Sequence, residues 1–123
     1  MRDYFLRVDA TELGTKSQPS ALSRVPAAAI PARFALRQNQ PNPFQRATTI
    51  RFELPVGAMV KLEVFDLSGR RVTTLANHYY PPGYHVVEWD QRDGAGDRAR
   101  PGVYFYRIEA GPFRSREKMV LLP

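Results

Sequence analysis

Apolar side chains recur at every second position over most of the chain beyond residue 47, and this alternation strongly limits the folds open to it. In the first run, Thr48, Ile50, Phe52 and Leu54 alternate with polar residues. In two later runs, the residues expected to face the core are Val60, Leu62 and Val64, and then His85, Val87 and Trp89. Because successive side chains of a strand point to opposite faces of a sheet, the pattern predicts half-buried β-strands.

Turn-forming residues separate these runs. Residues 66–69 end in a glycine, which adopts a positive φ without strain. Pro81 and Pro82 lack the backbone donors that a continuing ladder needs, and residues 90–101 carry the Asp-Gly and Gly-Asp pairs of a loop. Val72 and Leu75 then suggest a return strand between two of the runs.

The last third of the chain continues the β pattern. Residues 103–110 are rich in aromatic and β-branched side chains, and Gly111 and Pro112 precede a closing strand that ends in Met119, Val120, Leu121 and Leu122. Six or so short strands, about ten residues apart and without helices between them, predict an all-β antiparallel sandwich. Trp89 is the expected centre of its core.

The composition divides the chain into three parts. Residues 1–13 form a strand-like remnant or arm, residues 14–35 a linker rich in Pro, Ala and Ser, and residues 36–123 the folded domain. The pattern over residues 4–26 resembles the last two strands of a fibronectin type III module; it consists of Tyr4, Leu6, Val8, Ala10, Ser20, Leu22, Arg24, Val25 and Pro26. An isolated hairpin is marginal in water, so this extended N-terminal arm needs another partner.

Charge and composition exclude several function classes. The chain carries 18 Lys and Arg against 12 Asp and Glu, a net charge of +6, but its arginines are scattered and favour a solvated surface over nucleic-acid binding. No apolar run reaches the roughly 18 residues of a membrane-spanning helix, so membrane insertion is not expected. The absence of cysteine excludes a disulfide framework.

Several spaced motifs in one order carry a family resemblance. They comprise Leu36, Gln38, Asn39, Pro41, Asn42, Pro43 and Phe44; residues 48–52; residues 64–67 with Gly69 and Arg70; Gly83, His85, Val87, Trp89 and Asp90; residues 101–107; and residues 118–121. Residues 36–122 thereby resemble the C-terminal sorting domain of type IX secretion cargo and the related Ig-like domain of flagellar hook-capping proteins. The resemblance implies an immunoglobulin-like sandwich.

It also implies a role. Such a domain is a non-catalytic targeting and anchoring module of a secreted or cell-surface bacterial protein, and its implied partners are the outer-membrane type IX translocon and an associated surface protease. Machinery of this kind can recognise a folded surface and exposed sheet edges. The candidate recognition residues are Pro41, Asn42, Pro43 and Phe44 in the entry segment, and Lys118, Met119, Val120 and Leu121 in the closing strand.

The entry segment also has a purely structural interpretation. Pro41 and Pro43 fix φ and push the residue before each of them toward extended geometry, so the chain enters the sandwich on a rigid path with Phe44 as a plug. Tyr104 and Tyr106 are expected to pack in the core with their hydroxyls at its edge.

Metal binding and catalysis find little support. Asp90, Asp93 and Asp97 are candidate Ca²⁺ ligands, but their spacing differs from the EF-hand loop and aspartates commonly bond the backbone of such turns. We therefore expect no cofactor, with calcium as the minor alternative. His78, His85 and Ser68 lack the partners and frames of a catalytic site, so an enzyme is not expected.

Two further function classes stay open. The arm residues Tyr4, Leu6 and Val8 could add as a strand to another copy, which would make the chain a homo-oligomeric assembly module of a surface filament or array. Alternatively, the tyrosines Tyr79, Tyr80 and Tyr84 could serve a carbohydrate-binding accessory module.

Overall fold

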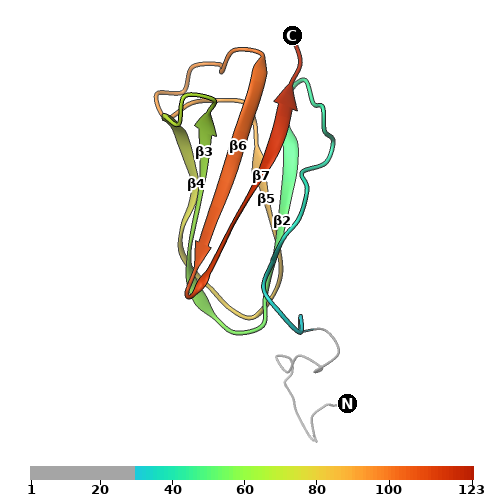
Figure 1. Ribbon diagram of the computed structural model, residues 1–123, viewed down its shortest axis with the longest axis vertical. Coiled ribbons are helices and arrows are strands. Elements are labelled where there is room, and N and C mark those ends of the chain that lie inside the picture. Colours follow the sequence, from blue (N-terminus) through green and yellow to red (C-terminus); the bar gives the residue numbers. More distant parts are fainter. Residues whose placement is uncertain (1–29) are drawn as a thin grey trace, which may run out of the picture. The chain divides into compact units, whose positions relative to one another are not determined.

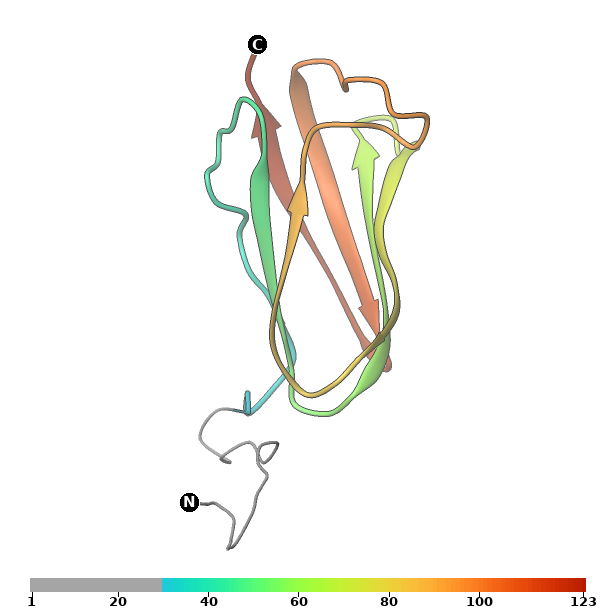
Figure 2. The same cartoon turned by 180° about the vertical axis from the view of Figure 1, so that it is seen from behind.

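The computed structural model describes residues 30–123, which form an all-β sandwich, as the alternation predicts. Its strands are β1 (Ala35–Leu36), β2 (Thr48–Leu54), β3 (Ala58–Asp66), β4 (Arg71–Tyr80), β5 (Gly83–Trp89), β6 (Gly102–Ala110) and β7 (Phe113–Leu121). Figures 1 and 2 show the same strands from opposite sides. The predicted N-terminal arm, with Tyr4, Leu6 and Val8, lies outside the described residues.

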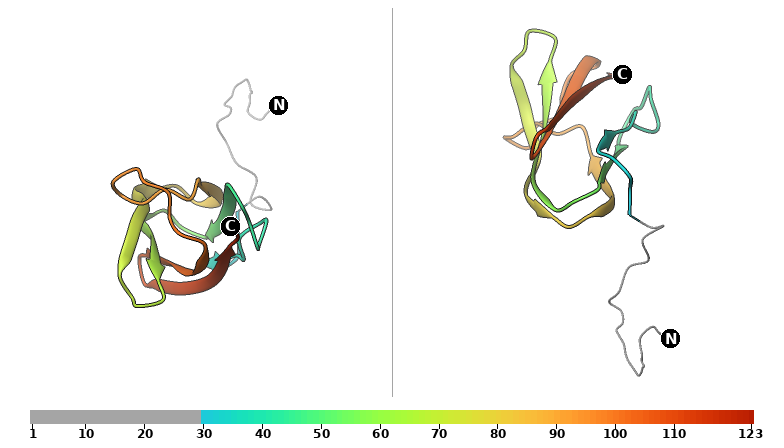
Figure 3. Two further views of the ribbon diagram at one scale, coloured as in Figure 1. Left: turned by 90° about the horizontal axis from the view of Figure 1, so that it is seen from above. Right: turned by 60° about the horizontal axis from the view of Figure 1, so that its bottom comes forward.

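Two antiparallel sheets make up the sandwich. One contains three strands in the order β1-β2-β5, and the other contains four in the order β4-β3-β6-β7. The view from above separates the two layers (Figure 3). The compact unit that holds both sheets spans Pro31–Pro123. Within the described part of the chain, no helix is long and apolar enough to cross a bilayer.

The core lies between the sheets and is built by the alternating residues. In β2, Ile50, Phe52 and Leu54 are fully buried, while Arg51 between them is exposed. Val60, Leu62 and Val64 of β3 are buried in the same way from the opposite sheet. The predicted inward faces are confirmed, because burying one side of each strand removes its apolar surface from water.

Trp89 is buried in this core, as predicted, and is only 1% exposed; as the last residue of β5 it lies toward one end of the sandwich. Its ring meets Phe44 at 5.7 Å and Tyr104 at 5.5 Å between centroids, in tilted and edge-on arrangements that aromatic pairs prefer. The indole Nε1 donates a hydrogen bond to the Arg92 carbonyl at 2.9 Å. The one polar atom of the indole is therefore satisfied at the end of the sandwich.

Glu63 lies on the polar face of β3 as the alternation predicts, yet it is only 3% exposed, which that pattern does not indicate. Its carboxylate accepts from Arg71 Nη1 at 3.3 Å and from Arg107 Nη2 at 3.2 Å. The Arg107 guanidinium also lies 4.6 Å from the centroid of the Phe65 ring. Long side chains of neighbouring strands thus cover an acid on the outer face of the sheet.

Replacing Trp89 tests the position of the core. We expect Trp89→Ala to lower the free energy of unfolding by about 3–5 kcal/mol, because the cavity left in a packed core cannot fully collapse. Urea denaturation followed by circular dichroism measures this. Val86 of the same strand is 60% exposed, so Val86→Ala should change stability by at most about 0.5 kcal/mol. Equal effects of the two substitutions would contradict the core assignment.

Candidate recognition site

The two segments predicted for recognition lie side by side in the structure. Phe44 N donates to the Val120 carbonyl at 3.0 Å, and Leu122 N donates to the Phe44 carbonyl at 2.8 Å, which makes a parallel bridge between Phe44 and Leu121. β7 is the last strand of its sheet, so the entry segment occupies part of an otherwise open edge. Phe44 therefore forms an isolated parallel bridge at the edge of β7.

Side chains strengthen this junction. The Asn42 Oδ1 accepts a hydrogen bond from Val120 N at 2.9 Å, and the Gln38 amide donates to the Lys118 carbonyl at 2.7 Å. Residues 38–44 are thus bonded to Lys118 and Val120, two successive edge-facing positions of β7.

The predicted recognition residues divide into accessible and buried groups. Pro41, Asn42, Pro43 and Lys118 are exposed, and Val120 is half-buried. Phe44, Met119 and Leu121 are buried in the core, and Phe44 fills the role of a plug. The buried members can influence recognition only by fixing the path of the backbone, whereas the exposed members can contact a partner.

A buried polar network holds the turn before Phe44. The Asn39 amide donates to Thr48 Oγ1 at 2.9 Å and to the Pro41 carbonyl at 3.1 Å, and Thr48 Oγ1 donates to the same carbonyl at 2.8 Å. The peptide bonds before Pro41 and Pro43 are both cis. The sequence motif indicates a rigid entry, but neither the cis geometry nor the pairing with β7 follows from it.

Among residues 30–123, β7 pairs with β6 along one side and with Phe44, through Leu121, on the other. No other strand pairs with the outer side of β7 before Leu121 in this part of the chain. The N–H and C=O groups of one residue point to the same side of a strand, and this side alternates along the chain. The N–H and C=O of Val120 both bond to the entry segment, so they point away from β6. Because the register between β6 and β7 has no shift, the N–H and C=O groups of Arg114, Arg116 and Lys118 point to the same edge.

Tyr106 connects β6 to the start of the entry segment. Its side chain is fully buried and its hydroxyl donates to the Arg37 carbonyl at 2.6 Å. Burial raises the pKa of Tyr106 well above its ordinary value of 10.0. Tyr104 behaves similarly, with its hydroxyl donating to the Arg100 carbonyl and burial raising its pKa. The prediction of core tyrosines with hydroxyls at the edge is confirmed.

The candidate calcium ligands are occupied with their own loop. Asp93 Oδ1 accepts from Ala95 N and Asp97 N, each at 2.9 Å, and Asp90 Oδ1 accepts from Arg92 N at 3.3 Å. Over residues 30–123, no group of three or more His, Cys, Asp or Glu side chains is arranged to hold a metal ion. The observed bonds are those of a backbone-stabilised turn.

The two histidines have packing environments. His85 Nε2 lies 2.7 Å from the Pro81 carbonyl, and its ring lies 5.3 Å from Phe52 and 4.9 Å from Tyr80 between centroids. The His78 ring stacks on the Tyr80 ring, with 4.3 Å between the two centroids.

Comparison with known proteins adds fold evidence. No family model and no curated protein sequence matches the chain. Its fold is similar to a segment of dimeric latent PorU from Porphyromonas gingivalis, with a TM-score of 0.59 and 22% identity over 74% of this chain and 10% of PorU. It is also similar to a segment of PorZ, described as an essential surface component of the type IX secretion system of that bacterium. There the TM-score is 0.50, with 17% identity over 73% of this chain and 11% of PorZ.

These two matches establish a likeness of fold at low sequence identity. Each match covers about a tenth of the solved protein, so the likeness concerns one segment of PorU and one segment of PorZ.

Substitution of Asn42 tests the junction. We expect Asn42→Ala to accelerate hydrogen exchange of the Val120 amide by about tenfold, because the amide loses its acceptor at an exposed edge. NMR-detected exchange provides the measurement. Gln45→Ala is the matched control, since that exposed side chain makes only a 3.4 Å contact with the Pro123 carbonyl. An unchanged Val120 exchange rate would contradict the assignment.

Alkaline pH should destabilise the fold through Tyr106. An unfolded tyrosine ionises near pH 10, whereas the raised pKa keeps the buried hydroxyl protonated in the folded state. The free energy of unfolding should therefore fall as the pH rises above about 10. Tyr106→Phe should lower the free energy of unfolding by about 1 kcal/mol at pH 8, because the hydrogen bond is lost. It should also make the free energy of unfolding fall less steeply with pH between pH 9.5 and about 11. A steeper slope in the variant would argue against this role.

Proposed function

We propose that the chain is a non-catalytic targeting and anchoring module of an extracellular or cell-surface bacterial protein, recognised by the outer-membrane type IX translocon and its associated protease. The observation that carries the proposal is the junction between residues 42–44 and β7, which brings the two segments predicted for recognition together on one sheet edge. The likeness of fold to segments of PorU and PorZ supports it.

The geometry of the junction suits recognition without chemistry. Pro41, Asn42 and Pro43 project from the edge as an exposed ridge, while Phe44 beneath them is anchored against Trp89. A partner that contacts this ridge meets a pre-ordered backbone and therefore loses little conformational entropy on binding. Lys118 adds an exposed charge beside the ridge.

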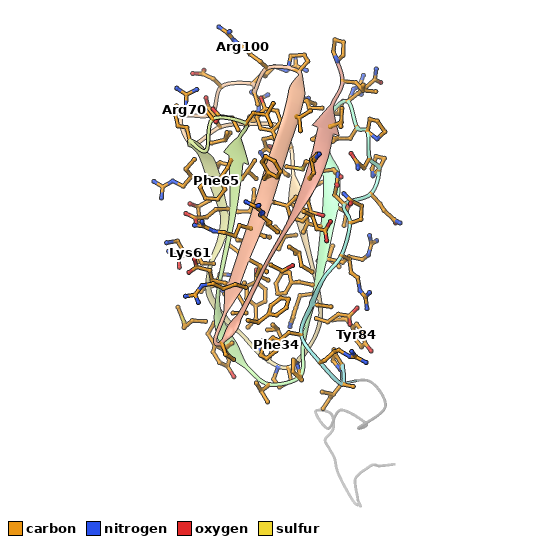
Figure 4. All side chains as sticks on the ribbon, viewed as in Figure 1. Phe34, Lys61, Phe65, Arg70, Tyr84 and Arg100 are labelled. Atoms are coloured by element: carbon orange, nitrogen blue, oxygen red, sulfur yellow. The ribbon has the colours of Figure 1, made fainter. Side chains whose placement is uncertain are left out.

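The carbohydrate-binding alternative gains no support from the arrangement of the tyrosines. Tyr79 is exposed on β4 and Tyr84 on β5, so they belong to different sheets, and Figure 4 shows Tyr84 at the lower end of the sandwich. Tyr80 packs against Phe52 with 5.1 Å between ring centroids. They do not present one continuous face for a sugar. The assembly alternative depends on the arm, which lies outside the described residues.

Export of a reporter tests the proposed function. The complete chain is fused to the C-terminus of a periplasmic reporter in a bacterium with a type IX system, and surface reporter is measured by protease accessibility. We expect surface display, reduced about fivefold by Lys118→Glu, since reversing a charge at the rim of a contact costs on the order of 1 kcal/mol.

Arg51→Glu is the matched control. The Arg51 side chain is exposed on β2, which belongs to the other sheet, so its reversal should leave export unchanged. Absence of the reporter from the surface with the unmodified chain would refute the proposal. Equal losses with both substitutions would show that net charge, not this edge, governs export.

A further inference from the structure

An open groove lies at the end of the sandwich where β3 turns into β4. Its volume is about 600 Å³, which is a typical size for a small-molecule site. One side of the groove comes from residues 66 and 70–72, the other comes from residues 93–95 and 98–100, and the buried Tyr104 completes the lining. Figure 4 shows Arg70 and Arg100 at this upper end of the sandwich. Two loops that are distant in the sequence therefore enclose one groove.

Four exposed arginines line this groove, although they are scattered in the sequence. Arg70 and Arg71 lie on one side, and Arg98 and Arg100 lie on the other. The guanidinium groups of Arg70 and Arg71 each pair with a carboxylate, at 3.2 and 3.3 Å. Among residues 30–123, those of Arg98 and Arg100 form no ion pair. The lining also contains two aspartates, so four arginines and two acids leave it with a net charge of +2.

Backbone hydrogen bonds fix the two sides of the groove relative to each other. Gly94 N donates to the Val72 carbonyl at 2.9 Å, which ties the second loop to β4. Arg98 forms an antiparallel bridge across its own loop, and the Tyr104 hydroxyl donates to the Arg100 carbonyl. A ligand that enters the groove therefore meets a pre-ordered backbone, and its binding does not have to order the loops.

The arrangement of the arginines favours phosphate over carboxylate. A guanidinium group offers parallel N–H donors that match two oxygens of either anion. A carboxylate has two oxygens in one plane, so one or two guanidinium groups saturate it. A phosphate group has more charge and presents three strong acceptor oxygens in different directions, which suits donors from opposite sides. A groove lined by one sign of charge also concentrates ions of the other sign.

We propose that this groove binds a ligand that presents two or more closely spaced phosphate groups. Arg98 and Arg100 provide the uncompensated charges that hold the phosphates, and Arg70 and Arg71 add donors from the opposite side. The inference does not depend on the proposed function, because the groove shares no residue with the junction between residues 42–44 and β7.

Calorimetric titration of the complete chain with inorganic tripolyphosphate tests the groove. We expect binding at about 150 mM NaCl, an ionic strength that largely screens interactions of isolated surface charges. Orthophosphate and the tricarboxylate tricarballylate should each bind at least about tenfold more weakly, because neither presents several linked phosphate groups. In NMR spectra, tripolyphosphate should shift the amide signals of residues 70–72 and 93–100, which line or adjoin the groove.

Two double substitutions separate the forked donors from the charge. Arg98→Gln with Arg100→Gln should weaken tripolyphosphate binding by about tenfold or more, because both uncompensated charges are lost. Arg98→Lys with Arg100→Lys keeps the charge but removes the paired donors, and should weaken binding by about threefold. Both side chains are exposed, so we expect each variant to fold, and Trp89 fluorescence checks this.

Arg51→Gln with Arg116→Gln is the matched control. It removes the same charge from two exposed positions that do not line the groove, so the affinity for tripolyphosphate should stay within about twofold. Equal losses in the groove variant and in this control would overturn the inference, because net charge alone would then explain binding.

Vesicles of phosphatidylcholine with phosphatidic acid identify the source of the phosphate groups. Vesicle binding that tripolyphosphate displaces would assign a phosphate-bearing headgroup, whereas tripolyphosphate binding without vesicle binding would assign a soluble compound. Three results would overturn the inference: no binding of tripolyphosphate, equal affinity for tricarballylate, or amide shifts confined to residues outside the groove.

Discussion

The entry segment joins the two sheets at one edge, and the arrangement of the rest depends on this connection. Gln40 exchanges backbone hydrogen bonds with Thr49 of β2 at 2.9 and 2.8 Å, and Phe44 bonds to both sides of Leu121 in β7. The chain therefore crosses from one sheet to the other within a few residues. Between these points the Asn39 and Thr48 side chains satisfy the Pro41 carbonyl. Buried polar groups without such partners would oppose the turn.

The burial of Phe44 gives this crossing its energetic support. Its ring contacts Trp89 from the three-stranded sheet while its backbone belongs to the edge of the four-stranded sheet. Burial of such a side chain contributes about 1.5–3 kcal/mol, and each edge hydrogen bond adds about 0.5–1.5 kcal/mol. The exposed ridge at Pro41, Asn42 and Pro43 is consequently held by a residue that no partner can reach.

The sequence predicts those features that depend on one strand at a time. Alternation identified the inward faces of β2, β3 and β5 and placed Trp89 in the core, because burial in a sandwich follows the period of two. It could not predict that Phe44 pairs with Leu121, since that contact joins distant segments whose local patterns are independent. The alternation could not predict the burial of Glu63 either, because Arg71 and Arg107 reach its carboxylate from neighbouring strands.

The two ends of β7 are covered by different means along its edge. Near Val120, Asn42 and Phe44 bond to the strand, and the Gln38 amide takes the Lys118 carbonyl. At the start of the strand, packing replaces hydrogen bonding, because the Phe34 ring stacks on Phe113 with 5.3 Å between centroids. On the outer face, Arg114, Arg116 and Lys118 are exposed, and cations on an edge strand discourage pairing with a second strand of like charge. The segment that precedes β2 and the outer charges therefore protect the same edge, the first by occupying it and the second by repulsion.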